Sequence, residues 1–443
     1  MSPILPFLLL LAPPQSSAAL APTAAAAARD GEVRYIVKPG DTLFNLAARY
    51  FVRQSDYRAV QALNHVADPY RLSIGKPLRI PRRLLRTEPV RGAVVAFRGS
   101  VSILAGGRSG VAAIGSVVNE GAVLATAAGA FVTVELPDGS RFSLPSASRV
   151  SVDRLRRTIL TREVERAFDL KAGRSEWQIT PAKSSGDTFH VTTPVATAAV
   201  RGTGFRVTYE DALSTFGVVE GKVAVADATP VPGELVPAGR GIAVRPESRS
   251  PQVQLAPAPE IIRPGAVQKA DAVSFRARPV PGATHYAFEL ATDAGFVDRI
   301  AERITPAPEA RFDAVPNGTY FLRASVTDAN GIQGLADTFS FDRRLNRVSL
   351  DDPAAGGFGG RKAYRFRWQG GGEGEAQYRF ILARDPAALD RVIDQAGLSV
   401  QDISVTDLRP GTYYWQVWSI RFEKGRSVET VTPPQKLQIG SGA

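Results

Sequence analysis

The sequence has no cysteine, and this single absence excludes three kinds of site. No disulfide can cross-link the fold, no thiol can act as a nucleophile, and no cysteine-ligated metal can be held. The three histidines, His65, His190 and His285, lie far apart in the sequence, and none has the spacing of a metal-ligand pair. We therefore expect no metal and no other cofactor, and we exclude cysteine peptidases and zinc endopeptidases.

Other catalytic signatures are also missing. The sequence has no Gly-x-Ser-x-Gly elbow, and no long helical region that could carry the catalytic glutamate of a lytic transglycosylase. A glycosidase with two carboxylates stays open, because the fold, not the sequence, sets the separation of the carboxylates. We expect a protein that is not an enzyme, with a cell-wall hydrolase as the less favoured alternative.

Charge is absent from the first 28 residues. An apolar run from Ile4 to Ala12 is followed by Ser16-Ser17-Ala18 and an alanine tract, which is typical of a secretory signal peptide. The run is shorter than the ~20 residues that a membrane-spanning helix needs. We expect residues 1–28 to be a signal peptide, cleaved between Ala18 and Ala28. The mature protein would have no membrane span and would be periplasmic or associated with the cell envelope.

The chain has 443 residues with 40 Gly and 32 Pro, which favours several domains built from short strands and turns. The predicted fold class is multidomain and mostly β. We expect a small βααβ module at 29–91, an all-β domain at 92–246, a Pro-rich extended linker at 247–265, and two β-sandwiches at 266–348 and 349–443.

A strand-helix-helix-strand pattern fills residues 35–81. A short strand ends in the turn Lys38-Pro39-Gly40, and Asp41 or Thr42 can cap the helix that follows. A second helix ends at Asn64, and a closing strand stops at Pro81.

The segment opens with Tyr-x-Val-x-x-Gly-Asp-Thr-Leu and closes with Leu-x-x-Gly-x-x-Leu-x-Ile-Pro, and it resembles a LysM domain. That family binds glycans that contain N-acetylglucosamine, chiefly peptidoglycan and chitin. The resemblance implies a ligand site between two loops. Asp41 and Thr42 could instead serve only the turn and the cap, although the two roles are compatible. The implied site residues are Gly40, Asp41, Thr42 and Leu43 in the first loop, and Tyr70, Arg71, Leu72, Ser73 and Ile74 in the second.

The net charge is +11, and residues 29–91 hold 13 Lys and Arg against 6 Asp and Glu. A basic glycan-binding module suits an anionic cell envelope, so peptidoglycan is the expected partner. Nucleic-acid binding is the rival interpretation. It lacks a platform of stacking aromatic residues, and export argues against it, so we expect no nucleic acid partner.

A second motif lies in residues 191–207. Thr193-Pro194, followed by Val200-Arg201-Gly202-Thr203-Gly204-Phe205, resembles the signature of the FecR domain, and the resemblance spans 92–246. It implies an all-β domain with Thr193, Pro194, Arg201, Gly202, Thr203 and Phe205 as its motif residues. We interpret Arg201 as a residue that pins a turn by bonding backbone carbonyls. Direct contact with a partner is the alternative.

The best-known FecR proteins pass the state of an outer-membrane receptor to a sigma factor. They carry a cytoplasmic helical segment and a membrane helix ahead of the domain, where this sequence has the signal peptide and the LysM-like module. We therefore do not expect direct regulation of a sigma factor. A further run, Arg162 to Arg166, fits a short helix or an exposed strand face, and we interpret it as a solvated face.

The C-terminal part contains a repeat. Residues 286–293 align with 378–385, and residues 317–323 align with 410–416, each copy with a Gly-Thr-Tyr strand opening. The pattern resembles fibronectin type III domains, which are commonly spacers or protein-binding modules. We assign Tyr413, Tyr414, Trp415 and Trp418 to the core and strand faces of the second copy, not to a sugar platform.

Together these observations predict a non-catalytic exported protein. It would bind peptidoglycan through the LysM-like module and present the FecR-like and sandwich domains to an unidentified envelope protein. The alternative is a sensory or regulatory component of the envelope that acts through the FecR-like domain.

Overall fold

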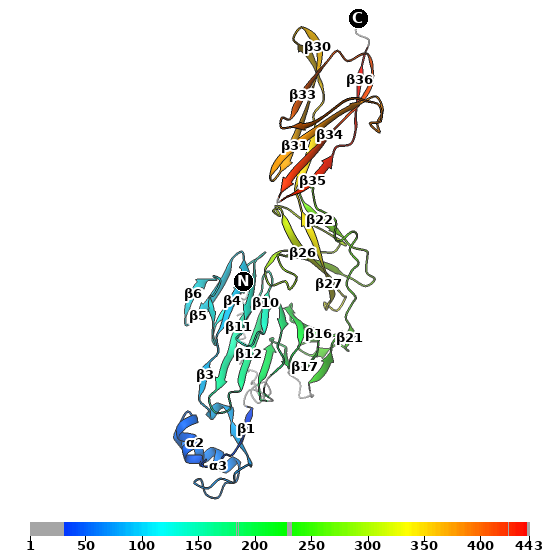
Figure 1. The fold of residues 1–443 in the computed structure, drawn as a ribbon. Coiled ribbons are helices and arrows are strands. Elements are labelled where there is room, and N and C mark those ends of the chain that lie inside the picture. Colours follow the sequence, from blue (N-terminus) through cyan, green and yellow to red (C-terminus); the bar gives the residue numbers. More distant parts are fainter. Residues whose placement is uncertain (1–30, 183, 185, 228–232, 424, 441–443) are drawn as a thin grey trace, which may run out of the picture. The chain divides into compact units, whose positions relative to one another are not determined.

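The computed structural model describes residues 31–182, 184, 186–227, 233–423 and 425–440 (Figure 1). The predicted signal peptide lies outside this part of the chain. Within it, no helix has the length and apolar character needed to cross a membrane. Two compact units are present. One holds the described residues up to Glu88 together with Arg157–Glu163, and the other holds the rest.

The first unit has the predicted strand-helix-helix-strand order. Its strands are antiparallel, with Tyr35 opposite Leu78. Buried residues from all four elements, among them Leu43, Leu46, Val60 and Ile80, form one core. The elements are β1 (Glu32–Ile36), α2 (Leu43–Tyr50), the 3-10 turn η1 (Gln54–Asp56), α3 (Tyr57–Leu63), β2 (Pro77–Pro81) and the 3-10 turn η2 (Arg82–Leu84).

Asn64 ends α3 and joins it to the closing strand. Its side-chain amide donates to the carbonyl of Arg79 at 2.7 Å and accepts from the Arg79 N–H at 2.8 Å. These two bonds pair the backbone carbonyl and N–H of Arg79 on the edge of β2 next to the end of the helix. A residue expected only to stop a helix therefore also fixes the position of the closing strand.

Residues 157–163 belong with the first unit, although the sequence placed them in the all-β domain. Leu160 packs against the first unit's core, and the Ile159 N–H donates to the Arg86 carbonyl at 3.0 Å. The buried carboxylate of Glu163 accepts a hydrogen bond from Arg82 at 2.7 Å. The small module is thus completed by a loop from later in the chain.

The interpretation of Arg162 to Arg166 as a solvated face is wrong. Glu163, Glu165 and Arg166 are all buried. Glu165 is bonded by Arg156 at 3.1 Å, and Arg166 donates to Asp138 at 2.7 Å. These charges tolerate burial because each has an opposite charge within hydrogen-bond distance.

The second unit begins with a ring of strands that closes on itself through hydrogen-bonded pairs. The pair of β12 and β13 is parallel, whereas the other strand pairs described for this ring are antiparallel. After β3 (Thr87–Pro89), which lies at the boundary between the units, the strands are β4 (Gly92–Arg98), β5 (Val101–Ala105), β6 (Arg108–Val111), β7 (Val117–Val118), β8 (Val123–Thr126), β9 (Phe131–Glu135), β10 (Arg141–Leu144), β11 (Arg149–Thr158), β12 (Val164–Gln178), β13 (Thr188–Thr192), β14 (Ala196–Val200), β15 (Gly204–Glu210), β16 (Leu213–Glu220), β17 (Lys222–Asp227), β18 (Glu234–Pro237), β19 (Arg240–Arg245), β20 (Ser248–Arg249) and β21 (Val253–Gln254).

An aromatic cluster fills the core of this ring. The Trp177 ring stacks on Phe142 with a centroid distance of 4.8 Å, and it lies 4.9 Å from Phe168 and 5.6 Å from Phe189. Trp177 is 1% exposed, and Phe205 from the FecR-like motif also stacks on it, with a centroid distance of 6.2 Å. Buried aromatic contacts of this kind are a large stabilising term for a β domain.

The segment 247–265 differs from the extended linker that we expected. Strands β20 and β21 pair with β19, and Val253 lies opposite Gly241. Leu255 and Ile261 are buried, in two separate apolar clusters. Its prolines indicated an extended chain, but the apolar residues between them add strands and core contacts to the neighbouring domains.

Two β-sandwiches follow, as predicted. Each has two sheets around a core of aromatic and branched side chains. The first contains β22 (Val273–Arg276), β23 (His285–Ala291), β24 (Arg299–Thr305), β25 (Glu309–Phe312), β26 (Gly318–Thr327) and β27 (Gln333–Arg343). The second contains β28 (Asn346–Leu350), β29 (Ala354–Phe358), β30 (Arg361–Gly372), β31 (Glu375–Ala383), β32 (Arg391–Leu398), β33 (Asp402–Thr406), β34 (Gly411–Glu423), β35 (Arg426–Val431) and β36 (Gln435–Ile439).

The sequence repeat is also a structural repeat. The Tyr320 hydroxyl donates to the Pro316 carbonyl at 3.1 Å, and the Tyr413 hydroxyl donates to the Arg409 carbonyl at 3.0 Å. Each tyrosine therefore bonds back to the residue four positions earlier, a corner device known from sandwich domains. Trp415 is fully buried, as assigned from the sequence.

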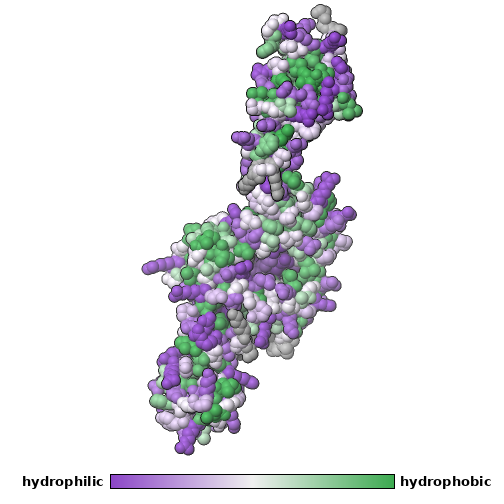
Figure 2. All heavy atoms as spheres, viewed as in Figure 1, coloured by the Kyte–Doolittle hydropathy of each residue, from purple (hydrophilic) through white to green (hydrophobic). Residues whose placement is uncertain are grey.

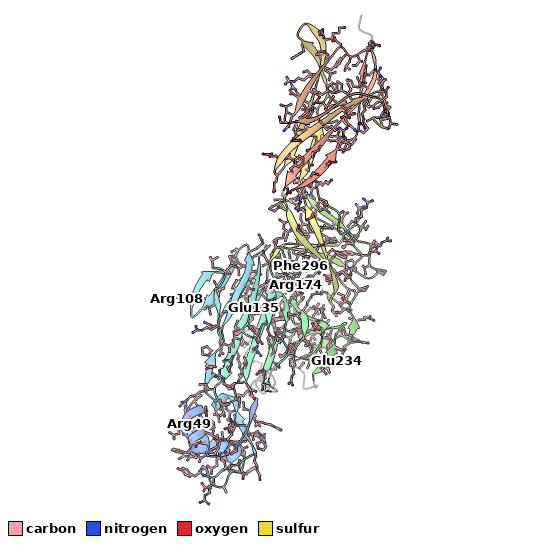
Figure 3. All side chains as sticks on the ribbon, in the orientation of Figure 1. Arg49, Arg108, Glu135, Arg174, Glu234 and Phe296 are labelled. Atoms are coloured by element: carbon pink, nitrogen blue, oxygen red, sulfur yellow. The ribbon has the colours of Figure 1, made fainter. Side chains whose placement is uncertain are left out.

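The all-β ring and the first sandwich share an interface within the second unit. Arg174 on β12 forms a bidentate pair with Glu302 on β24 at 2.7 and 2.6 Å. The Thr133 hydroxyl donates to the Val297 carbonyl at 2.8 Å. Figure 3 labels Arg174 and, from the sandwich, Phe296. Leu255 packs between the two domains in an apolar cluster with Ala243 and Ile332.

Candidate functional site

The two predicted loops of the first unit lie side by side. The Leu43 N–H donates to the Pro69 carbonyl at 2.8 Å, and the Gly75 N–H donates to the Val37 carbonyl at 2.8 Å. The Val37 N–H in turn donates to the Lys76 carbonyl at 3.1 Å. The structure therefore brings together residues 37–43 and 69–76, as the LysM resemblance implied.

Asp41 stabilises the first loop from within. One carboxylate oxygen accepts hydrogen bonds from the Tyr35 hydroxyl and from the Lys38 N–H, both at 2.8 Å. Burial, together with this bond to a carboxylate, raises the pKa of Tyr35 to about 12. Gly40 has a φ of +84°, which favours glycine in this turn. The side chain of Asp41 thus has a structural role, whatever its contact with a ligand.

Thr42 is the N-cap of α2. Its hydroxyl accepts from the Asn45 N–H at 3.0 Å, and the Asn45 side chain accepts from the Thr42 N–H at 2.9 Å. This reciprocal capping box satisfies two backbone donors at the start of the helix. The Asn45 amide also donates to the Gly40 carbonyl at 2.8 Å, which ties the cap to the turn.

Thr42→Ala is expected to lower the free energy of opening of α2 by about 1 kcal/mol, because it removes the capping hydroxyl. Native-state hydrogen exchange at the α2 amides measures this quantity. Thr42→Ser is the matched control and should retain most of the protection. Equal losses in the two variants would show that the hydroxyl does not hold the helix.

Three exposed apolar side chains surround the paired loops. Tyr70 is 63% exposed, Ile74 is 64% exposed and Phe44 is 40% exposed. The rings of Phe44 and Tyr70 lie 5.8 Å apart, which places an aromatic pair on the surface. On the face drawn in Figure 2, hydrophobic residues are interspersed with hydrophilic ones over this end of the chain. An apolar wall of this kind suits the methyl groups of N-acetyl sugars.

Not every predicted residue contributes a side chain to this surface. Leu43 is fully buried and Leu72 packs against the core, so either could reach a ligand only through its backbone. Phe44 was not predicted. Its signal was available, because it stands beside Leu43 but outside the buried stripe of α2 formed by Leu43, Leu46 and Ala47.

The backbone donors of the two loops differ in availability. The N–H groups of Asp41, Thr42 and Leu43 all bond within the protein. In the second loop, the N–H groups of Leu72, Ser73 and Ile74 have no acceptor among the described residues. A sugar carbonyl would therefore find its donors in the second loop.

The FecR-like motif is a tightly packed turn. The buried Thr193 hydroxyl accepts from the Ser214 hydroxyl at 2.7 Å and from the Ala196 N–H at 3.0 Å. Gly202 has a φ of +67°, and a Cβ there would lie 2.9 Å from the Pro181 Cα. Thr203 and Phe205 are each 1% exposed. These residue types are therefore required by packing.

Arg201 and Pro194 are the exposed members of the motif. We expected the Arg201 guanidinium to bond backbone carbonyls, but no such bond is present in the described part of the chain. The backbone turns because Gly202 follows Arg201, so the arginine is not needed to hold the turn. Contact between Arg201 and a partner remains as the alternative interpretation.

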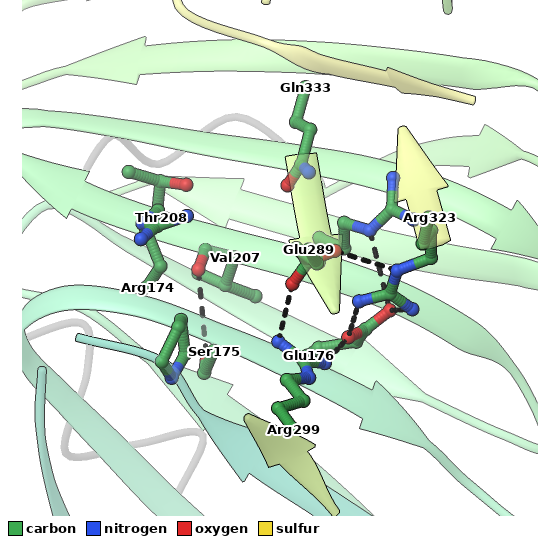
Figure 4. Close-up of a pocket in the computed structure, with 11 residues that line it drawn as sticks. Arg174, Ser175, Glu176, Val207, Thr208, Glu289, Arg299, Arg323 and Gln333 are labelled. Carbon is green, nitrogen blue, oxygen red and sulfur yellow. Dashed lines mark hydrogen bonds and ion pairs between the residues drawn. The ribbon is translucent and has the colours of Figure 1, made fainter. Parts of the chain in front are cut away.

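A cavity of about 20 Å³ lies in the second unit, between the all-β ring and the first sandwich (Figure 4). Charged residues from both domains line it. Glu176 on β12 accepts hydrogen bonds from Arg323 at 2.9 and 2.8 Å. Glu289 on β23 accepts from Arg299 at 2.9 Å and from Arg323 at 2.7 Å. Arg299 also pairs with Glu176.

Burial alone would raise the pKa of both carboxylates, but the guanidinium groups outweigh it. Arg323 and Arg299 bring the pKa of Glu289 down to about 2. Arg323, Arg299 and Arg206 hold the pKa of Glu176 well below its ordinary value. Both residues are thus charged at neutral pH. The sequence offered one signal for this cluster, a carboxylate between Phe288 and Leu290 in an otherwise apolar strand.

These pKa values predict a loss of stability in acid. A carboxylate whose folded pKa is lowered stabilises the fold above its ordinary pKa of 4.5, and this contribution disappears as the pH falls toward about 2. For Glu289 the contribution is on the order of 3 kcal/mol. Hydrogen exchange at β23, corrected for the intrinsic effect of pH, should show this loss of stability between about pH 5 and about pH 2, the limits that linkage sets. A Glu289→Gln variant with the same pH dependence would contradict the assignment.

Two family models match the chain. One, described as LysM domain, matches residues 35–81, and one, described as FecR protein, matches residues 122–224. The predicted resemblances to the LysM and FecR families are therefore confirmed, the second over residues 122–224 of the 92–246 that we expected. An uncharacterized protein of Deinococcus radiodurans is 37% identical over 51 residues, which are 12% of this chain. The match spans only 20% of that curated relative's own length.

Solved structures give weaker likenesses. A candidate anti-sigma factor from Parabacteroides distasonis is 23% identical over 30% of this chain and 59% of its own, with a TM-score of 0.25. The fibronectin(III)-like modules of Clostridium thermocellum CbhA are 13% identical over 41% of this chain and 93% of theirs, with a TM-score of 0.18. At these TM-scores neither likeness carries an argument about function.

Proposed function

We propose that this protein is exported and binds peptidoglycan through residues 35–81, and that its β domains serve protein interaction in the cell envelope. The observation that carries the proposal is the exposed apolar surface of Phe44, Tyr70 and Ile74 beside the unbonded N–H groups of residues 72–74. Together they supply what an N-acetyl group needs, which is donors for its carbonyl and apolar contact for its methyl.

The charge around the site suits an anionic polymer. Lys38 and Lys76 are exposed and flank the two loops, and the exposed Arg71 side chain pairs with Asp68 at 3.9 Å. Attraction to carboxylates of the cell wall adds to binding and weakens as salt rises.

The test is co-sedimentation of the purified protein with peptidoglycan. Tyr70→Ser combined with Ile74→Ser is expected to weaken binding about tenfold or more, because two exposed apolar contacts are lost. Val52→Ser is the control. Val52 is also exposed, at 57%, but it follows the opposite end of α2.

Raised salt separates the contribution of apolar contact to binding from that of charge attraction. Binding is expected to weaken with salt but to persist, and the double variant is expected to bind poorly at every salt concentration. Binding that salt abolishes and the double variant retains would mean that charge attraction alone holds the protein to the wall.

A second candidate function is sensing or regulation in the envelope. The observation that favours it is the FecR match at 122–224, with Arg201 exposed on the motif's turn. Both matched families are binding or regulatory rather than catalytic, which supports the proposal that the protein is not an enzyme. A gene for a sensor kinase, cyclase or sigma factor beside this gene would favour the regulatory function.

A further inference from the structure

The buried charges around the cavity in the second unit do not balance. Arg174 is neutralised by Glu302, which bonds it twice. The three remaining guanidinium groups share two carboxylates, which leaves one positive charge. These groups are Arg206, Arg299 and Arg323 against Glu176 and Glu289.

The surplus falls on Arg206. Arg299 and Arg323 each bond both carboxylates, whereas the Arg206 Nε lies 3.5 Å from the nearest Glu176 oxygen. One Arg206 Nη donates to the Gly334 carbonyl at 2.7 Å. Its Nε is buried and has no hydrogen-bond partner among the described residues. A buried donor that carries charge and lacks a partner is costly, so an occupant of the cavity should satisfy it.

The size of the cavity limits that occupant. About 20 Å³ is enough for one water-sized particle, which favours a monatomic anion over phosphate or sulfate. Water would satisfy the Arg206 Nε but would leave the surplus charge. A monatomic anion does both. The Thr208 hydroxyl also lines the cavity and can donate to such an ion.

We propose that this cavity binds one halide-sized monovalent anion, with the Arg206 Nε as its main donor and Thr208 beside it. The carboxylates of Glu176 and Glu289 line the same cavity, but the guanidinium groups of Arg299 and Arg323 bond them. Since the cavity's residues come from the all-β ring and from the first sandwich, the anion would stabilise the interface between these two domains.

Thermal unfolding of the full protein in sodium chloride, compared with sodium gluconate at equal concentration, tests the site in solution. Chloride is expected to raise the melting temperature of the second unit by about 2–4 °C, with a dependence that saturates. Arg206→Met and Thr208→Val should each reduce this chloride-specific shift. Arg141→Met is the control, because Arg141 forms an exposed pair with Glu135 at 2.6 Å.

Anomalous diffraction from crystals soaked in sodium bromide tests the position. A bromide peak within hydrogen-bond distance of the Arg206 Nε, together with the chloride-specific shift, would support the proposal. A shift that both cavity variants retain, or no difference between chloride and gluconate, would overturn it. A bromide peak without the solution effect would mean an adventitious ion only and would also overturn it.

Discussion

Glu289→Gln is expected to lower the stability of the first sandwich by about 3–5 kcal/mol, the usual effect of removing one partner of a buried ion pair. Glu289 is 3% exposed and is bonded by both Arg299 and Arg323. The amide can accept a hydrogen bond but cannot offset two guanidinium charges. The side chain keeps its size, so the expected loss comes from charge and not from packing.

Native-state hydrogen exchange at the β23 amides is the suitable measurement, because it reports a local free energy in a chain with several domains. Glu135→Gln is the matched control. Glu135, which is labelled in Figure 3, pairs with Arg141 in the all-β ring. Both side chains are more than a third exposed. Its loss should be about 1 kcal/mol or less. Similar losses in the two variants would mean that Glu289 is not a buried charge partner.

Trp177→Ala is expected to destabilise the all-β ring by about 3–5 kcal/mol. The indole is 1% exposed, stacks on Phe142 and contacts Phe168. Its N–H also donates to the Ser175 hydroxyl at 2.8 Å. Alanine would leave a cavity inside a cluster of aromatic rings that cannot collapse without moving several strands.

Hydrogen exchange at β10 and β15 measures this effect, because both strands contribute rings to the cluster. Ile114→Ala serves as the control in the same domain, since Ile114 is 65% exposed and should change the stability by less than about 0.5 kcal/mol. A small effect of Trp177→Ala would contradict the view that these aromatic residues form the centre of the domain.

The small module was predictable because its determinants are close in sequence. The turn at Gly40, the cap at Thr42 and the stripe from Leu43 act over a few residues, and each leaves a local pattern. Phe44 was not predicted, because its exposure is evident only when all the residues of the buried stripe of α2 are compared. The repeat of Tyr320 and Tyr413 was readable for the same local reason.

The buried charges were not predictable from local pattern. Glu163 is buried because Arg82 lies opposite it, and Glu176 because Arg323 comes from another domain. Such partners are 81 and 147 residues apart in sequence, so a charge run looks solvated until the fold supplies its partner. The same reason explains why the place of residues 157–163 was not predicted. They complete the first unit, whose continuous segment of sequence ends at Glu88.

The measurement that tests the central claim most directly is hydrogen exchange of the purified protein with and without soluble peptidoglycan fragments. If the glycan site is as proposed, the fragments will newly protect Leu72, Ser73 and Ile74, whose N–H groups are unbonded in the structure, with little change in the sandwiches. The double variant Tyr70→Ser, Ile74→Ser should lose this protection at residues 72–74. Protection that spares residues 69–76 and falls elsewhere in the chain would contradict the assignment of the glycan site.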